Sequence, residues 1–175
     1  MPGWPKFLLC SNERIRDRFM RIITVSGAHS GVGKTTVAEA LLKKLKGWSC
    51  LKVTVRHNGG FCPTGRDCGV CDTLSSKFCI VSDENIIEEK DKDTQRFKAS
   101  GAKKVLWLKA KPEGLKQGLK KAIAKFKGAK GLIIEGNSAL RYIEPDLAIF
   151  LKRKNSLLKD SAWPAIKKAD LVLNL

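Results

Sequence analysis

Apolar residues along this chain fall into short continuous runs that are separated by segments of helical periodicity. The runs have the length and the apolar character of strands that are buried on both faces of a sheet. They lie at 21–26, 51–55, 78–81, 104–108, 132–134, 147–151 and 171–173. The segments between them place apolar residues three or four positions apart, which predicts helices with one buried face. They span 34–46, 91–100, 113–127 and 162–168.

Strands that alternate with helices are joined by right-handed crossovers, so the expected fold is α/β, with a mostly parallel sheet between two layers of helices. At 175 residues the chain is long enough for one domain. We expect this domain to occupy 20–175, with an extension at 1–19 before the first strand. The segment at about 58–80 is rich in glycine and cysteine and is expected to be an insert.

The strongest motif is the sequence GAHSGVGKTT, which begins at Gly27 and joins the first strand to the first helix. It fits the Walker A pattern, with Ala28 in place of the first glycine, and predicts a P-loop NTPase fold. Glycines let the backbone turn closely around a phosphate, and the N–H groups at the helix start attract the anion. The lysine would contact the β- and γ-phosphates, and the threonine after it would bind Mg²⁺. The residues expected to bind nucleotide are Gly27, His29, Ser30, Gly31, Val32, Gly33, Lys34, Thr35 and Thr36.

An acidic residue near the metal is the second element that such a site requires. The run LIIEG places Glu135 at the end of an apolar strand, in the form of a Walker B segment. Because the carboxyl ends of parallel strands gather at one edge of a sheet, Glu135 is expected to hold a metal-bound water or to polarise the attacking water. Lys34 and Glu135 are thus the expected catalytic residues, and Thr35 and Glu135 the expected Mg²⁺ ligands. Asp83, which follows the run at 78–81, is the alternative acid.

Cysteines cluster in the expected insert. Cys62, Cys68, Cys71 and Cys79 follow the spacing C-x5-C-x2-C-x7-C. Four thiolates can hold a tetrahedral Zn²⁺ or an iron–sulfur cluster, and a metal would order a glycine-rich loop. The alternative is a set of unpaired thiols, with Cys79 part of the core.

The net charge of the chain indicates which classes of partner it can bind. Thirty-four Lys and Arg against 17 Asp and Glu give a net charge of +17. This favours an anionic partner, such as a nucleotide, an anionic cofactor or an acidic protein. At 103–130 lysines are not interleaved with arginines and aromatic residues, which argues against specific nucleic-acid recognition. The apolar runs are too short to cross a membrane, and 1–19 lacks the features of a secretory signal, so a cytoplasmic location is expected.

Further stretches of the chain resemble the molybdopterin-guanine dinucleotide biosynthesis adaptor (MobB) family, in the order found there. VTVRH at 53–57 is similar to the family's second strand, KDTQRFKASGA at 92–102 to its helix and turn, and IEG at 134–136 to its strand end. With the Walker loop, these stretches span about residues 20–150. The Walker loop is also similar to those of dethiobiotin synthetase and of metal-site maturation GTPases.

The MobB resemblance implies a small GTP-binding protein, often a homodimer, that assists attachment of a nucleotide to molybdopterin, an anionic pterin. His57, Asp93 and Glu135 would line its site. The family's His-rich stretch after the second strand is replaced here by Asn-Gly-Gly and the cysteine segment. The segment that ends near Asn174 resembles the guanine-binding strand of metal-maturation GTPases, which makes Asn174 a candidate contact for the base.

The sequence therefore predicts Mg²⁺-dependent binding and slow hydrolysis of GTP or ATP, by an adaptor in molybdopterin guanine dinucleotide biosynthesis. One alternative is a metal-centre maturation NTPase or metallochaperone that uses the cysteine cluster. Another is an ATP-dependent ligase or small-molecule kinase that resembles dethiobiotin synthetase.

Overall fold

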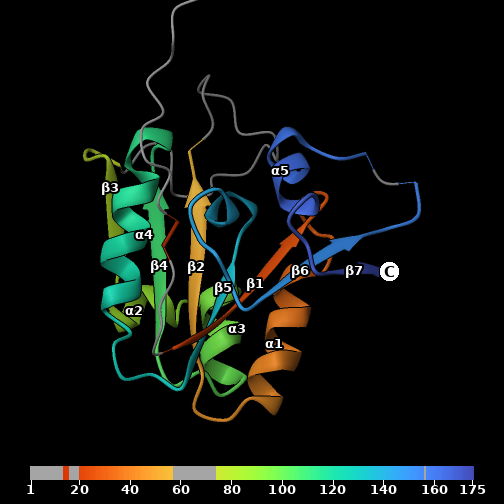
Figure 1. Ribbon diagram of the computed structural model, residues 1–175. Coiled ribbons are helices and arrows are strands. Elements are labelled where there is room, and N and C mark those ends of the chain that lie inside the picture. Colours follow the sequence, from red (N-terminus) through yellow and green to blue (C-terminus); the bar gives the residue numbers. More distant parts are fainter. Residues whose placement is uncertain (1–13, 16–19, 57–73, 156) are drawn as a thin grey trace, which may run out of the picture.

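A seven-stranded sheet forms the centre of the molecule, with helices on both of its faces (Figure 1). The computed structural model describes residues 14–15, 20–56, 74–155 and 157–175. The strand order is β3-β4-β2-β5-β1-β6-β7, and neighbouring strands pair in parallel except for β3 and β4. The predicted three-layer α/β fold with a mostly parallel sheet is therefore confirmed.

The strands are β1 (Arg21–Gly27), β2 (Ser49–Val55), β3 (Phe78–Val81), β4 (Val105–Ala110), β5 (Gly131–Glu135), β6 (Leu147–Lys152) and β7 (Leu171–Asn174). The α-helices are α1 (Lys34–Lys44), α2 (Glu84–Ile87), α3 (Asp93–Ala99), α4 (Leu115–Ala124) and α5 (Trp163–Ile166). Short 3₁₀ helices lie at Pro112–Gly114, Asn137–Arg141 and Asp160–Ala162.

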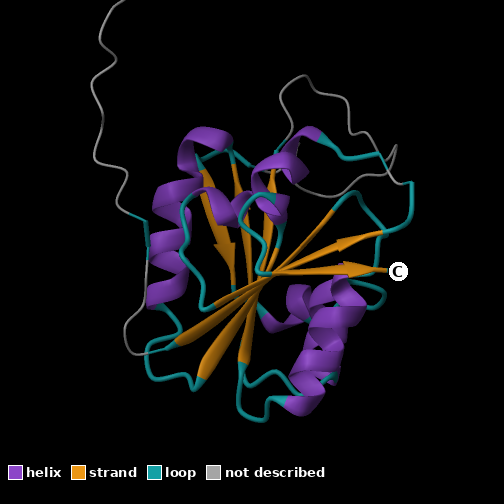
Figure 2. Cartoon of the chain, turned by 45° about the vertical axis from the view of Figure 1, so that its right-hand side comes forward, coloured by secondary structure: helices purple, strands orange, loops and turns teal. Residues whose placement is uncertain are grey.

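Helices lie on both sides of the central sheet (Figure 2). Side chains along the strands alternate between the two faces of the sheet, and each face has its own apolar core. On one face α4 packs against the sheet with Leu119 and Ile123. On the other face α1, α2 and α3 contribute Leu42, Ile87 and Phe97. A third cluster joins α5 and the 3₁₀ helix Asn137–Arg141 to β6.

The helices are shorter than the apolar periodicity predicts. The segment expected to be one helix at 113–127 divides into a 3₁₀ turn and α4, which ends at Ala124. The α2 helix has only four residues, too few to produce a periodic pattern, and the sequence does not predict it. Among the described residues, no helix has both the length and the apolar character that a membrane span requires.

The edge strand β3 runs antiparallel to β4, with Phe78 opposite Ala110. The amide of Arg56, just after β2, donates to the carbonyl of Ala110 at 2.9 Å, and the amide of Lys111 donates to the carbonyl of Lys77 at 2.9 Å. Arg56 and Lys77 therefore both lie at the edge where the parallel strands end. Because β3 starts at this edge, it finishes at the opposite one.

Candidate phosphate-binding site

The Walker sequence forms a tight loop between β1 and α1. Gly31 and Gly33 have φ values of 77° and 104°, which L side chains rarely adopt. Gly33 occupies the N-cap position of α1, and in the part of the chain that the structure describes no side chain caps this helix. The amides at the start of α1 are therefore left for an anion at the loop.

Asn137 fixes the start of this loop from the end of β5. The amide of Gly27 donates to Oδ1 of Asn137 at 2.8 Å, and Nδ2 of Asn137 donates to the carbonyl of Gly27 at 2.8 Å. All these groups are buried, so the pair of hydrogen bonds sets where β1 ends relative to β5. The sequence analysis missed Asn137, although its position directly after the Glu-Gly strand end is a signal that could have identified it.

The end of β5 also lies close to β2. A Cβ at Gly136 would lie 2.6 Å from the carbonyl oxygen of Val53, and the φ of Gly136 is 141°. The amide of Gly136 donates to the carbonyl of Val25 at 3.0 Å. Glycine is thus required at the strand end that carries Glu135.

The side chains of the loop fold back on its own backbone. Nζ of Lys34 donates to the carbonyl of His29 at 3.0 Å, across the mouth of the loop. Nδ1 of His29 lies 2.7 Å from the carbonyl oxygen of Ser30. Val32 is fully buried in the core beside α1, whereas Thr36 is exposed. The ammonium of Lys34 is therefore held against the backbone of the Walker loop.

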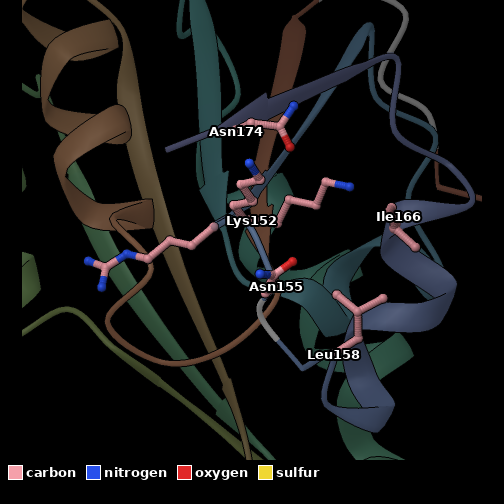
Figure 3. Close-up of a pocket in the computed structure, with 7 residues that line it drawn as sticks. Lys152, Asn155, Leu158, Ile166 and Asn174 are labelled. Atoms are coloured by element: carbon pink, nitrogen blue, oxygen red, sulfur yellow. The ribbon is translucent and has the colours of Figure 1, made fainter.

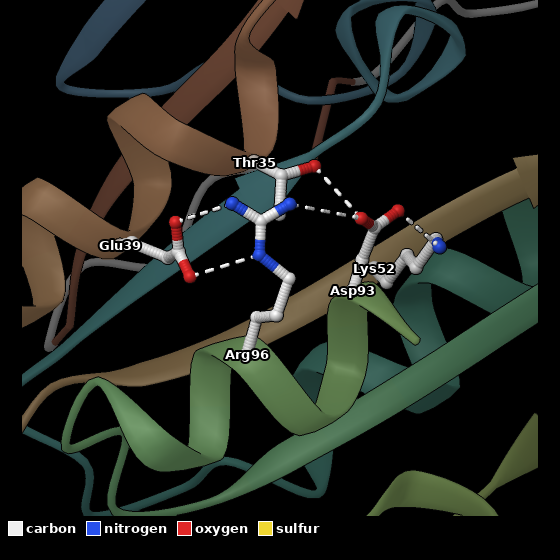
Figure 4. Close-up of polar contacts among 5 residues, drawn as sticks. All are labelled: Thr35, Glu39, Lys52, Asp93 and Arg96. Atoms are coloured by element: carbon white, nitrogen blue, oxygen red, sulfur yellow. Dashed lines mark hydrogen bonds and ion pairs between the residues drawn. The ribbon is translucent and has the colours of Figure 1, made fainter. Parts of the chain in front are cut away.

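Thr35 is joined to α3 by a polar network (Figure 4). Its Oγ1 donates to Oδ1 of Asp93 at 3.0 Å, and Nζ of Lys52 lies 2.6 Å from Oδ2 of the same carboxylate. Lys52 comes from β2, and its ammonium lies 5.3 Å from the centroid of the Trp107 ring. The sequence analysis did not identify Lys52, because a lysine within an apolar strand gives no motif.

A second ion pair ties α3 to α1 (Figure 4). Nε and NH2 of Arg96 donate to the two carboxylate oxygens of Glu39, at 3.0 and 2.7 Å. NH1 of Arg96 also lies 4.0 Å from Oδ1 of Asp93. The two-pronged contact is directional, so it fixes α3 against the helix that carries Thr35.

Opposing effects act on the carboxyl of Asp93. Its partial burial would raise its pKa, but the charge of Lys52 and the hydrogen bonds from Lys52 and Thr35 lower it, and the net pKa lies below the usual value. Asp93 is therefore ionised at neutral pH. It accepts a hydrogen bond from the threonine that the Walker pattern assigns to Mg²⁺.

The pKa of the Glu135 carboxyl is shifted in the opposite direction, above its usual value. Glu135 is 6% exposed, and burial raises its pKa, while the charges of Lys34 and Lys52 act to lower it. In the sheet Glu135 pairs with Val25 of β1 and with Lys52 of β2. Its carboxyl also interacts electrostatically with Lys34, the lysine of the Walker loop.

The donor set at this edge suits a hard cation. The Thr35 hydroxyl and the Asp93 carboxylate meet at 3.0 Å, and Mg²⁺ prefers hydroxyl and carboxylate oxygens. Asp83, the alternative acid, lies past the opposite end of β3 and accepts a hydrogen bond from the amide of Asn85 as the cap of α2. The antiparallel direction of β3 explains why the structure does not bring Asp83 to the loop.

Several expected site residues fall outside the described part of the chain. These are His57, Cys62, Cys68 and Cys71. Cys79, the fourth expected metal ligand, is described: it is exposed on β3, which rules out the alternative that it is part of the core. Among the described residues, no group of three or more His, Cys, Asp or Glu is placed to hold a metal ion.

A cavity of about 440 Å³ opens beside the loop, at the ends of β6 and β7 (Figure 3). Asn174 lines it, as does Asn155, and Leu158 and Ile166 supply apolar surface. The remaining lining residues are Lys152, Arg153 and Lys154. Leu175, which follows Asn174, lies beside Gly33, since a Cβ on that glycine would be 3.2 Å from its Cδ1. The cavity is therefore adjacent to the start of α1.

No protein-family model matches the chain, and no curated protein matches it in sequence. The structure is similar to that of LpxK from Aquifex aeolicus, solved in complex with ATP, with a TM-score of 0.51 and 20% identity. The match covers 92% of this chain and 50% of LpxK, so the chain spans about half the length of that protein. At this identity the likeness concerns the fold alone, an α/β fold built on a mostly parallel sheet.

Proposed function

We propose that the protein binds a Mg²⁺–nucleoside triphosphate at the loop between β1 and α1 and promotes slow hydrolysis of its γ-phosphate. The observation that carries this proposal is the geometry of the loop. Glycines with positive φ, the uncapped start of α1 and the ammonium of Lys34 are together suited to a polyphosphate chain.

Each residue of the site would have a role in nucleotide binding or hydrolysis that suits its chemistry. The amides of the loop and Lys34 would bind the phosphate oxygens and stabilise the charge that develops on them. Thr35 and the carboxylates of Asp93 and Glu135 would hold Mg²⁺, which neutralises phosphate charge when it is bound. Glu135, whose pKa is raised by burial, would also position the attacking water.

The cavity at the ends of β6 and β7 would receive the base. Asn155 and Asn174 each offer a donor and an acceptor to the edge of a base, and Leu158 and Ile166 offer apolar contact to its face. The similar structure was solved with ATP, which makes ATP the first nucleotide to test. GTP is the second, because the MobB family binds it.

Calorimetric titration of the full chain with Mg²⁺–ATP and Mg²⁺–GTP tests this proposal. The Lys34→Ala variant should bind about 10- to 100-fold more weakly, because it loses charge-assisted hydrogen bonds to phosphate. Lys43→Ala on the exposed side of α1 removes the same charge and should bind as the wild type does. Equal affinity of Lys34→Ala and wild type would contradict nucleotide binding at the loop.

A finer role as a MobB-like adaptor is favoured by where the resembling stretches lie. Asp93 of 92–102 meets Thr35, and Gly136 of 134–136 lies against Val53 of 53–57. The stretch at 92–102 therefore contacts the loop and the other two stretches contact each other, as parts of one site would. An adaptor should release the γ-phosphate to water, whereas a ligase or kinase should transfer it. Incubation with γ-labelled nucleotide and candidate acceptors distinguishes the two, and a labelled acceptor would rule out the adaptor role.

A further inference from the structure

The end of β6 and the loop that follows β6 both contact the Walker loop. The amide of Ala28 donates to the carbonyl of Leu151 at 2.8 Å, and the amide of Lys159 donates to the carbonyl of Ala28 at 3.2 Å. Ala28 also packs with Ala162 and Ala165 in one buried cluster. Lys159 is thus tied by its backbone to the second residue of the Walker sequence.

The side chain of Lys159 lies close to the groups that face the phosphate site. Lys159 is exposed, and its charge interacts with the like charge of Lys34 and with the carboxyl of Glu135. Glu135 in turn interacts with the charges of Lys34, Lys52 and Lys159. Lys34 and Lys159 therefore both lie near the carboxyl of Glu135.

Such an arrangement has a local excess of positive charge. Like charges that are held together cost free energy unless an anion compensates them. The backbone contact to Ala28 holds this excess at the loop that is shaped for phosphate. The terminal phosphate of a triphosphate carries the charge that would compensate both lysines.

We propose that Lys159 is a second phosphate-binding lysine, which the loop after β6 supplies in cis and which contacts the terminal phosphate together with Lys34. This inference rests on the proposed nucleotide binding and deepens it. In many P-loop proteins a cation from a partner stabilises the charge on the transferring phosphate. Here the chain's own Lys159 would take that part, and it would make the site prefer a triphosphate over a diphosphate.

Calorimetry with two probes tests the role of Lys159: Mg²⁺–adenosine 5′-(β,γ-imido)triphosphate and Mg²⁺–ADP, with the guanosine counterparts run in parallel. Lys159→Met should weaken binding of the triphosphate by about 10-fold and leave the diphosphate affinity nearly unchanged. Lys159→Arg keeps the charge and should retain the preference. Lys167→Met removes an equal charge from an exposed position near α5 and should behave as the wild type.

The outcomes separate this inference from the proposed function. If wild type and Lys159→Met prefer the triphosphate equally, while Lys34→Ala loses affinity, Lys159 has no phosphate contact and only this inference fails. If the wild type binds neither probe nor its guanosine counterpart, the proposed function fails and this inference fails with it. A change in thermal unfolding of Lys159→Met without a change in the preference would also overturn the inference, because it would assign Lys159 a purely structural part.

Discussion

The two flanks of the Walker loop are held in different ways. On the α3 flank, Asp93 and Glu39 each have a cationic partner, Lys52 and Arg96, so the charges are compensated within the protein. On the flank formed by the loop after β6, the contacts to Ala28 are backbone hydrogen bonds and apolar packing.

On this second flank positive charge exceeds negative charge. Lys34 and Lys159 both lie near one carboxyl, that of Glu135, and the described residues that line the adjacent cavity include cations and amides but no acidic side chain. The α3 flank therefore serves to position Thr35. We therefore expect an anionic ligand to meet an excess of positive charge on the β6 flank.

The largest effect is expected at Asn137, which holds Gly27 at the start of the Walker loop between the two flanks. Asn137→Ala removes both hydrogen bonds to Gly27 and leaves a buried amide and a buried carbonyl without partners. The loss should be about 2–4 kcal/mol in the free energy of unfolding, at about 1–2 kcal/mol for each bond. Urea unfolding of the variant measures it.

Ser138→Ala, at the next position in the same 3₁₀ helix, is the matched control and should change stability little. If Asn137→Ala is as stable as Ser138→Ala, the hydrogen bonds between Asn137 and Gly27 do not support the loop.

Smaller effects on stability, opposite in sign to each other, are expected when the carboxyls of Asp93 and Glu135 are replaced. The pKa of Asp93 is lowered, so its ionisation stabilises the fold above the usual aspartate range, and this stability is lost as pH falls through the lowered value. The pKa of Glu135 is raised by burial, so its ionisation destabilises the fold as pH rises past the usual glutamate range. Near neutral pH, Asp93→Asn should therefore lower the melting temperature and Glu135→Gln should raise it. Both differences should shrink toward about pH 3.

Glu113→Gln, which alters an exposed carboxyl, should show neither trend. Thermal unfolding of the nucleotide-free variants across this pH range is the measurement. Shifts of the same sign for Asp93→Asn and Glu135→Gln would contradict the assignment of opposite environments to the two carboxyls.

The smallest effect is expected at Arg96, whose side chain is 42% exposed. Arg96→Met removes the two-pronged contact to Glu39 and should cost at most about 1 kcal/mol, because solvent screens an exposed ion pair. Arg96→Lys retains the charge but not the paired geometry, so it should restore only part of the loss. Chemical unfolding of both variants tests this, and full recovery by lysine would show that charge alone holds α3 to α1.

The elements that the sequence predicted well are those that local chemistry determines. The apolar runs became strands, and the glycines at 31 and 33 took the positive φ that the Walker pattern requires. Strand direction at the sheet edge is not a local property. The run at 78–81 looks the same whether it pairs parallel or antiparallel, so the position of Asp83 could not be foreseen.

Contacts between residues that are far apart in the sequence could not be predicted from it either. Lys52 and Asp93 are separated by 41 positions, and Asn137 and Gly27 by 110. The pairing of Asn137 with Gly27 follows from the position of β5 beside β1, which the sequence pattern alone does not specify. Asp93 lies on α3, so its pairing with Lys52 depends on how that helix packs against the sheet. The MobB resemblance placed Asp93 at the site, but the partner that holds its charge came only from the structure.

The direction of β3 determines where the residues that flank the cysteine-containing stretch 57–73 lie in the sheet. Arg56 and Lys77, which flank the undescribed stretch 57–73, are both tied by backbone hydrogen bonds to the end of β4. A parallel β3 would have required the chain to descend the whole length of the sheet before pairing. Because β3 is antiparallel, Arg56 and Lys77 instead both lie at the rim that carries the Walker loop, so substitutions at either of these two residues would act close to the candidate phosphate site.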